Sequence, residues 1–176
     1  MSQALEPWRL VGKTITRIGL RVFPPYGEAK RSHADISLWL DVEGEGPDSV
    51  LIAISGQDNW SPLVERVRIA RSLPWESLTS QLEAWMTMSC EATFEHEFYD
   101  ATCSEAFSGF VGKRIDRVQA ICLASATDEP LGLRLQVADD WLQIYPNVDG
   151  SMVESGFFKF GRGLVEFEPL GEVVFV

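Results

Sequence analysis

Two short segments of this chain carry nearly the same pattern of residues, one at positions 10–18 and the other at positions 110–118. Leu10–Ile18 and Phe110–Val118 share Val, Gly, Lys, Ile and Arg at equivalent places. The residues that follow each copy are also similar, because apolar residues alternate with polar ones in both. A pattern that recurs in this way is typical of an internal duplication. The chain is therefore predicted to fold as two related halves, about residues 8–55 and 108–146.

Each half contains three segments with the residue pattern of β-strands. Apolar side chains at every second position are typical of a strand with one buried face. An acidic turn separates the second and third segments, at 43–48 in the first half and at 138–140 in the second. The segments are 18–22, 36–42 and 50–54 in the first half and 118–122, 131–137 and 141–145 in the second. Each half is thus predicted to be a three-stranded antiparallel meander.

The clearest helical pattern lies between the two halves, over about residues 73–87. Pro74 stands at its start, where a proline is tolerated in the first helical turn. Apolar residues then recur at helical spacing, and polar residues such as Glu76 and Glu83 occupy the other face. The apolar stripe comprises Trp75, Leu78, Leu82, Trp85 and Met86. We expect an amphipathic helix whose apolar face covers a sheet.

The C-terminal part of the chain is predicted to form strands over about residues 156–176. Segments 157–160 and 164–167 flank Gly161–Gly163, which has the composition of a hairpin turn. Together with the two meanders and the helix, these strands predict one α+β domain over residues 1–176, built mostly of antiparallel sheet.

The net charge of the chain excludes some classes of partner. There are 15 Lys and Arg residues against 26 Asp and Glu residues, which gives a formal net charge of −11 at pH 7. Binding to nucleic acid or to an anionic membrane surface rests mainly on Lys and Arg, so both are disfavoured. A basic protein partner fits this charge better.

The N-terminal residues and the cysteines indicate a reducing compartment. The chain does not open with a basic stretch followed by an apolar one, so no signal peptide is predicted. Cys90, Cys103 and Cys122 are an odd number without a Cys-x-x-Cys spacing, and we expect them to be reduced thiols. These features predict a cytoplasmic protein.

The acidic residues are concentrated in two stretches that contain no Lys or Arg, residues 32–65 and 72–112. Blocks of one sign are often interaction surfaces, because a focused negative field accelerates the encounter with a cationic partner. The alternative is that these acids lie on solvated turns and on a polar helix face. Trp60, in a loop of the first stretch, is a candidate apolar anchor. The predicted partner-binding residues are Asp41, Glu43, Glu45, Trp60, Glu91, Glu95, Glu97 and Asp100.

His96 lies between Glu95 and Glu97, and the other histidine of the chain is His33. On a strand the His96 side chain would point away from both neighbouring glutamates, whereas a metal site needs several ligands on one face. No nucleophile motif accompanies the histidine, and neither Gly-Lys pair has the glycine-rich loop of a phosphate site. We therefore predict no catalytic residue, no metal site and no cofactor.

The pattern Val-Gly-Lys-x-Ile-x-Arg, followed by two alternating strands around an acidic turn, resembles small acidic bacterial proteins of the toxin-immunity type. The resemblance covers the two predicted meanders. It implies a compact α+β domain without enzymatic activity, located in the cytoplasm, that occludes the active site of a cognate toxin.

Together these features favour a non-enzymatic protein-binding module, an immunity protein or inhibitor whose acidic surface meets a basic toxin or enzyme. Two other classes of function stay open. A small-molecule-binding protein or an enzyme would use a cleft between the two halves. A homo-oligomeric structural subunit would pair the free strand edges of the meanders between chains.

Overall fold

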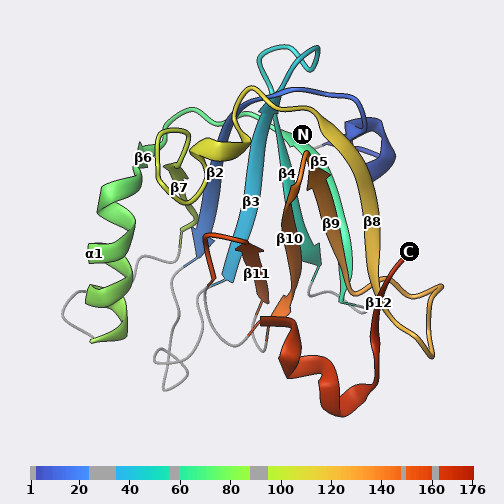
Figure 1. Cartoon of the computed structure of the whole chain (residues 1–176). Coiled ribbons are helices and arrows are strands. Elements are labelled where there is room, and N and C mark those ends of the chain that lie inside the picture. The colour runs from blue at the N-terminus through green and yellow to red at the C-terminus, as the bar shows by residue number, and fades with distance from the viewer. Residues whose placement is uncertain (1–2, 24–34, 56–59, 88–94, 148–149, 160–162) are drawn as a thin grey trace.

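In the computed structural model of this protein, the described residues form two β-sheets, one α-helix and short 3-10 helices (Figure 1). The structure describes residues 3–23, 35–55, 60–87, 95–147, 150–159 and 163–176. Strands account for most of the regular structure, and nearly all neighbouring strands run antiparallel. The described chain is therefore mainly antiparallel β with one helix, as predicted for an α+β fold.

The larger sheet has seven strands, and its central strands are strongly apolar on one face. Their order is β1 (Gln3–Ala4), β5 (Ser61–Val67), β4 (Ser49–Ser55), β3 (Asp35–Val42), β2 (Ile15–Phe23), β7 (Glu97–Asp100) and β6 (Leu73–Pro74). Ile36, Leu38 and Leu40 alternate along β3 and are all buried on the same face. Among the described strands, only the short edge strand β6 runs parallel to its neighbour. The alternation in the sequence thus defines which face of this sheet enters the core.

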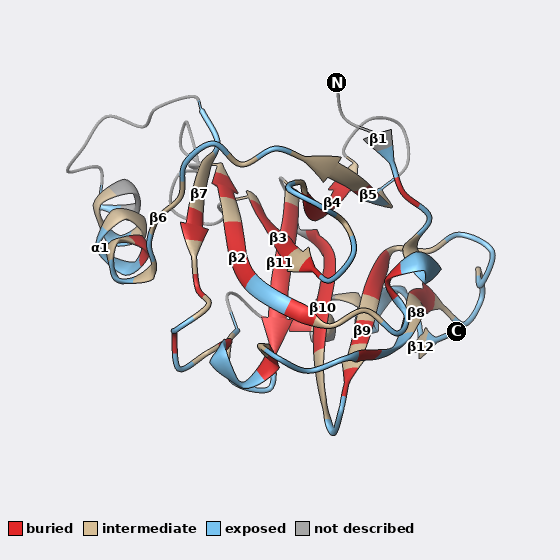
Figure 2. Ribbon diagram, turned by 90° about the horizontal axis from the view of Figure 1, so that it is seen from above, coloured by how far each residue is buried: buried red, intermediate tan, exposed pale blue. Residues whose placement is uncertain are grey.

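The smaller sheet has five strands and packs against the larger one. Their order is β11 (Gly150–Ser155), β10 (Asp140–Asn147), β9 (Gly132–Val137), β8 (Ile115–Leu123) and β12 (Val173–Phe175). β10 and β11 lie against β3 and β4, and Figure 2 shows many buried positions on these strands. Leu38 and Ile52 of the larger sheet share one apolar core with Leu135, Ile144 and Val153 of the smaller. The two sheets therefore stabilise each other by burying their inner faces together.

Two similar turns join the sheets at the starts of β2 and β8. Each turn follows a short 3-10 helix, η1 (Pro7–Leu10) or η3 (Ser108–Phe110), and contains a glycine with a left-handed backbone. The φ angle is 83° at Gly12 and 77° at Gly112. The amides of Gly12 and Gly112 donate hydrogen bonds of 2.8 Å to the carbonyls of Ile115 and Ile15, respectively. A second reciprocal pair of backbone hydrogen bonds, each 2.9 Å, connects the same two turns.

The helix α1 (Trp75–Met86) lies beside the edge of the larger sheet formed by β6 and β7 (Figure 1). It falls within the predicted range. Leu78 is buried, and the Trp75 ring makes edge contacts with Phe107 and Phe158 at centroid distances of 5.5 and 5.7 Å. Trp75, at the start of the apolar stripe, therefore packs against the segments that follow β7 and β11.

The C-terminal segment differs from the prediction of strands over 156–176. The predicted strand at 164–167 is wrong, because residues Gly163–Leu170 form the 3-10 helix η4. Among the described residues of this segment, β12 is the only strand, and Gly161 and Arg162 of the predicted turn lie outside the described residues. Leu164 and Phe167 both pack against a small apolar cluster on the outer face of the smaller sheet. Residues three apart point to opposite faces of a strand but to the same face of a 3-10 helix. The helix thus buries both side chains, which a strand would not do.

Gly19 in β2 provides the space in which Trp39 is buried. The Trp39 side chain is fully buried, and its Nε1 donates a hydrogen bond of 3.2 Å to the carbonyl of Tyr99. A Cβ atom added at Gly19 would collide with both this carbonyl and the Trp39 ring. Glycine is therefore required here by the close approach of neighbouring groups.

Substitution Gly19→Ala should destabilise the protein by about 1–3 kcal/mol or more, because neither a backbone carbonyl nor a packed indole ring can move away freely. Gly109→Ala is the matched control, since no atom lies within 4 Å of the added Cβ there. Urea unfolding of both variants measures the difference in the free energy of unfolding. Equal transition midpoints for the two variants would contradict this account of the Trp39 site.

Candidate functional site

Arg17 connects two of the predicted acidic residues that are far apart in the sequence. Its strand, β2, lies between β3, which carries Asp41, and β7, which carries Asp100. The guanidinium donates hydrogen bonds to the Asp41 carboxylate at 3.2 Å and to the Asp100 carboxylate at 2.7 Å. It also lies over the Trp39 ring, 5.4 Å from its centroid. One carboxylate from each acidic stretch therefore lies near the other, but Arg17 between them compensates both negative charges.

The pKa of Asp100 reflects this arrangement. Partial burial acts to raise the pKa, but hydrogen bonds from Arg17 and from Thr102 outweigh it and hold the pKa below its ordinary value. The folded state thus favours the charged form of Asp100. We conclude that Asp41 and Asp100 connect three strands of the sheet through Arg17.

Glu45 is more enclosed than Asp41 and Asp100. Its side chain is only 8% exposed, and it forms ion pairs with Lys13 at 3.3 Å and with Arg66 at 2.6 Å. Burial acts to raise the pKa of Glu45, but Arg66 and Lys13 outweigh burial and lower the pKa. Glu45 therefore ties the β3–β4 turn to β5 and to the glycine turn that precedes β2.

The other predicted residues have different surroundings. Glu43 and Glu95 are exposed, and Trp60 has 44% of its surface exposed. Glu97 accepts a hydrogen bond of 2.5 Å from the Tyr99 hydroxyl, and burial together with this bond raises the pKa of the phenol. Glu91 lies outside the described residues. Glu43, Trp60 and Glu95 thus remain available to a partner.

The surroundings of His96 do not form a recognisable catalytic or metal centre among the described residues. Its ring lies 4.9 Å from that of Phe23, and partial burial together with the charge of Arg21 lowers the pKa of the imidazole. Within the described ranges, no three His, Cys, Asp or Glu side chains are grouped so as to hold a metal ion. His33 falls outside those ranges.

Three exposed acids that sequence reasoning did not select lie on and near α1. These helical-edge acids are Glu76, Glu83 and Glu105. Glu76 and Glu83 stand seven residues apart, which places them on one face of the helix. None of the three forms an ion pair with another described residue. The spacing of the two helical glutamates is visible in the sequence, whereas the position of Glu105 near Glu76 is not.

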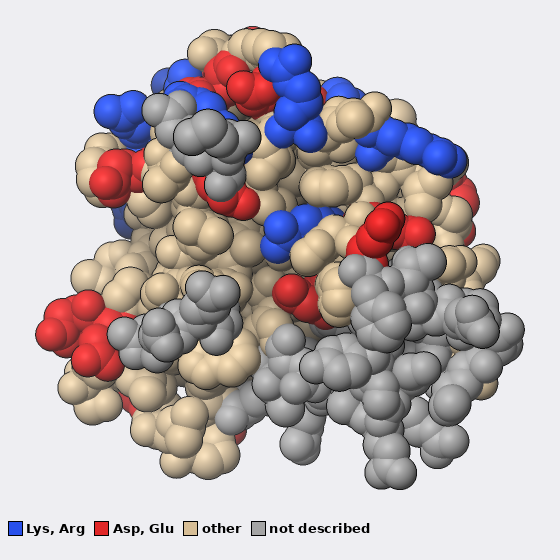
Figure 3. All heavy atoms as spheres, turned by 180° about the vertical axis from the view of Figure 1, so that it is seen from behind, with Lys and Arg blue, Asp and Glu red and all other residues tan. Residues whose placement is uncertain are grey.

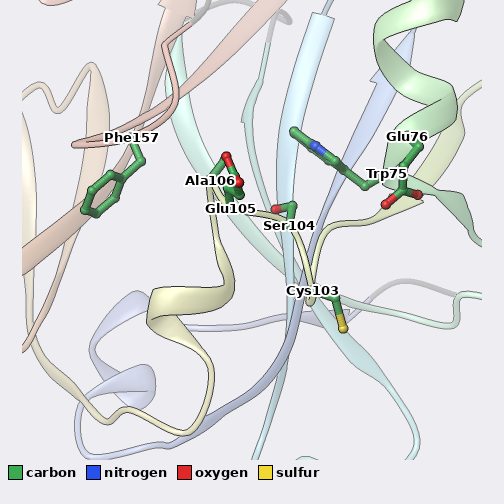
Figure 4. Close-up of a pocket in the computed structure, with 7 residues that line it drawn as sticks. All are labelled: Trp75, Glu76, Cys103, Ser104, Glu105, Ala106 and Phe157. Atoms are coloured by element: carbon green, nitrogen blue, oxygen red, sulfur yellow. The ribbon is translucent and has the colours of Figure 1, made fainter.

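Two of the helical-edge acids line a pocket of about 560 Å³ (Figure 4). Figure 4 shows that the lining comes from the first turn of α1, from the segment after β7 and from the segment after β11. The lining residues are Trp75, Glu76, Cys103, Ser104, Glu105, Ala106 and Phe157. The Ser104 hydroxyl donates a hydrogen bond of 2.8 Å to the carbonyl of Ala101, so it is not poised as a nucleophile. Carboxylates and aromatic rings are the main functional groups of this pocket.

Comparisons of the chain with protein-family models, with curated proteins and with solved structures found no match. Among the residues that the structure describes, no helix has the length and apolar character needed to span a membrane.

Substitution Glu45→Gln should cost about 1–3 kcal/mol of stability at pH 7, because Arg66 and Lys13 lose a charged hydrogen-bonding partner. A carboxylate with a lowered folded-state pKa contributes stability above its unfolded pKa and loses it as the pH falls through the folded value. The difference between wild type and variant should therefore shrink as the pH falls below the ordinary glutamate value of 4.5.

Urea unfolding at a series of pH values from about 7 to 3 measures this difference. The control is Glu43→Gln, which removes the same charge from an exposed neighbour and should change stability by about 0.5 kcal/mol or less. If the difference between wild type and Glu45→Gln were the same at every pH, the ion pairs of Glu45 would not be the cause.

Proposed function

We propose that this chain is a non-enzymatic protein-binding module that presents an acidic surface around α1 to a basic partner. The observation that carries the proposal is the absence of Lys and Arg from residues 72–112, combined with the exposure of Glu76, Glu83 and Glu105. Figure 3 shows Lys and Arg on the viewed face mostly toward the upper end of the molecule. On this face, positive charge is thus gathered toward one end of the molecule.

The helical-edge acids differ from Asp41, Asp100 and Glu45 in that no ion pair within the described chain compensates their charges. Asp41 and Asp100 share Arg17, and Glu45 is held by two cations, so these three carboxylates already have partners within the chain. An exposed carboxylate without an internal cation contributes its full field to the approach of a partner. Glu43, Trp60 and Glu95 remain candidate contacts on the same reasoning.

The partner we propose is a basic toxin or enzyme, which the bound module would inhibit by covering its active site. Enzymes that act on anionic substrates have basic sites, and such a site is complementary to the acidic surface around α1. Cys103 and Cys122 are free thiols, which supports a reducing cytoplasm as the place of action. The inner faces of the described strands are filled by apolar side chains, which favours a surface site over a cleft between the halves.

The test of this function is capture of a partner from the native host and measurement of its affinity. The variant Glu76→Gln/Glu83→Gln/Glu105→Gln should weaken binding by roughly tenfold or more, because it removes the steering field and its contacts. The control Asp128→Asn/Glu129→Gln/Glu172→Gln removes the same net charge from exposed residues elsewhere and should bind almost as wild type does. Affinity should fall as the salt concentration rises. A salt-independent affinity, or equal effects of the two variants, would overturn the proposal.

We also propose that residues 8–55 and 108–146 are two copies of one three-stranded meander. Each begins with a 3-10 helix and a glycine of positive φ. The strands β2, β3 and β4 lie side by side in chain order within the larger sheet, as β8, β9 and β10 do within the smaller sheet. An irregularity in strand pairing also occurs at the equivalent place, between Ile15 and Arg17 and between Ile115 and Arg117. These features support a common origin beyond the shared residue types.

Exchanging residues 10–18 with residues 110–118 tests this proposal. If the two segments are equivalent, the exchanged chain should still unfold cooperatively and lose only about 3 kcal/mol or less, since the core volumes at each site are similar. The control carries the same residues in reversed order at both places and should not fold. An exchanged chain that behaves like the control would contradict the proposal. Circular dichroism and urea unfolding distinguish the two outcomes.

A further inference from the structure

We propose that the pocket beside α1 receives one arginine side chain of the protein partner. This inference rests on the proposed function and adds the chemistry of the contact. The pocket is lined by two acidic residues, Glu76 and Glu105, and by two aromatic residues, Trp75 and Phe157, and its lining contains no Lys, Arg or His (Figure 4). These groups select the charge and the shape of the occupant.

The charge of the pocket favours a cation. Glu76 and Glu105 contribute two negative charges from two different segments. The N-terminal end of α1 opposes them with a partial positive charge equivalent to only about half an elementary charge. An anionic ligand would therefore be repelled, and a cation would be attracted.

The aromatic rings favour a cation that is carried on an apolar stem. Trp75 is held by its edge contacts with Phe107 and Phe158, at angles of 80° and 70°. Phe157 is 71% exposed, so its ring is accessible to a partner. Aromatic faces attract Lys and Arg heads and also cover the methylene groups behind them. A small inorganic cation has no apolar stem for the rings to cover, so it would gain less from them than a Lys or Arg side chain.

The chain itself shows how an arginine uses such a set of groups. Arg17 is held by two carboxylates from different strands, Asp41 and Asp100, and lies over the ring of Trp39. The pocket offers the same set to a partner, with two carboxylates from different segments and a tryptophan. A planar guanidinium can donate to two separated carboxylates at once, whereas an ammonium group is closer to a point charge. Arginine is therefore the expected occupant.

The pocket also lies where a partner would meet the rest of the acidic surface. Glu83 is two helical turns beyond Glu76 on the same face of α1. Cys103, Glu76, Glu105 and Phe157 are all exposed, so the pocket opens directly to the surface. A side chain from a protein surface can thus enter while its backbone stays with the partner.

The experiment is an NMR titration of the 15N-labelled full chain with Nα-acetyl-arginine-N-methylamide. Saturable shifts are expected at the amides of Trp75, Glu76 and residues 103–106, with a dissociation constant in the millimolar range, roughly 1–10 mM, since only one side chain binds. The citrulline analogue has the same shape without the charge and should bind at least about tenfold more weakly. No saturable shift up to about 100 mM, or equal binding of citrulline, would overturn the inference.

Variants locate the site and separate this inference from the proposed function. Glu76→Gln/Glu105→Gln should weaken binding of the arginine probe at least about tenfold, and Phe157→Ala should weaken it several-fold. Asp128→Asn/Glu129→Gln should leave the titration unchanged, which controls for net charge. If the probe does not bind but a partner still depends on the helical-edge acids, only the pocket inference fails. If the probe binds but the partner ignores those acids, the proposed function fails.

Discussion

Each sheet has one strongly apolar face, and each can remove that face from water only by packing against the other sheet. This mutual burial positions every other feature of the molecule. The reciprocal hydrogen bonds between the Gly12 and Gly112 turns fix the starts of β2 and β8 relative to each other, so that the two inner faces meet. A left-handed backbone at both glycines makes this short connection possible.

The strand order of the larger sheet also determines which acidic residues keep a free charge. Because β2 lies between β3 and β7, Arg17 reaches carboxylates on both sides, and these acids serve the cohesion of the sheet. The helix α1 lies beyond the sheet edge, and the stretch around it carries no Lys or Arg. Glu76 and Glu83 therefore have no internal cation in the described structure. Which carboxylates lack an internal cation thus depends on the order of the strands as well as on the number of acidic and basic residues.

The sequence predicted elements with local signals and missed those that depend on distant partners. Alternation in 36–42 and helical spacing after Pro74 identified β3 and α1, because each pattern lies within one element. Leu164 and Phe167 are predicted to lie in a strand, because a spacing of three residues does not by itself indicate a 3-10 helix. It does so only when the apolar cluster that both side chains contact is known.

The candidate site shows the same limit more strongly. Asp41 and Asp100 were selected as partner-binding residues because no cation lies near them in the sequence, and Arg17 becomes their neighbour only through the sheet. The pocket is formed by three segments, at 75–76, 103–106 and 157, so no single sequence motif could predict it. What the sequence did convey was the absence of Lys and Arg from 72–112, and that absence carries the proposed function.

The proposed surface divides recognition into two physical parts. Exposed carboxylates such as Glu83 act over a distance of about 8–10 Å at ordinary salt concentrations, so they mainly affect the rate of encounter. The rings of Trp75 and Phe157 act only on contact, and contacts of this kind mainly affect how long a complex lasts. Because Glu76 and Glu105 remain partly solvated, an entering guanidinium gives up less hydration than it would in a closed core. An arginine that fits this pocket therefore adds lifetime and selectivity to an association that the net charge of the surface alone would leave fast but unspecific.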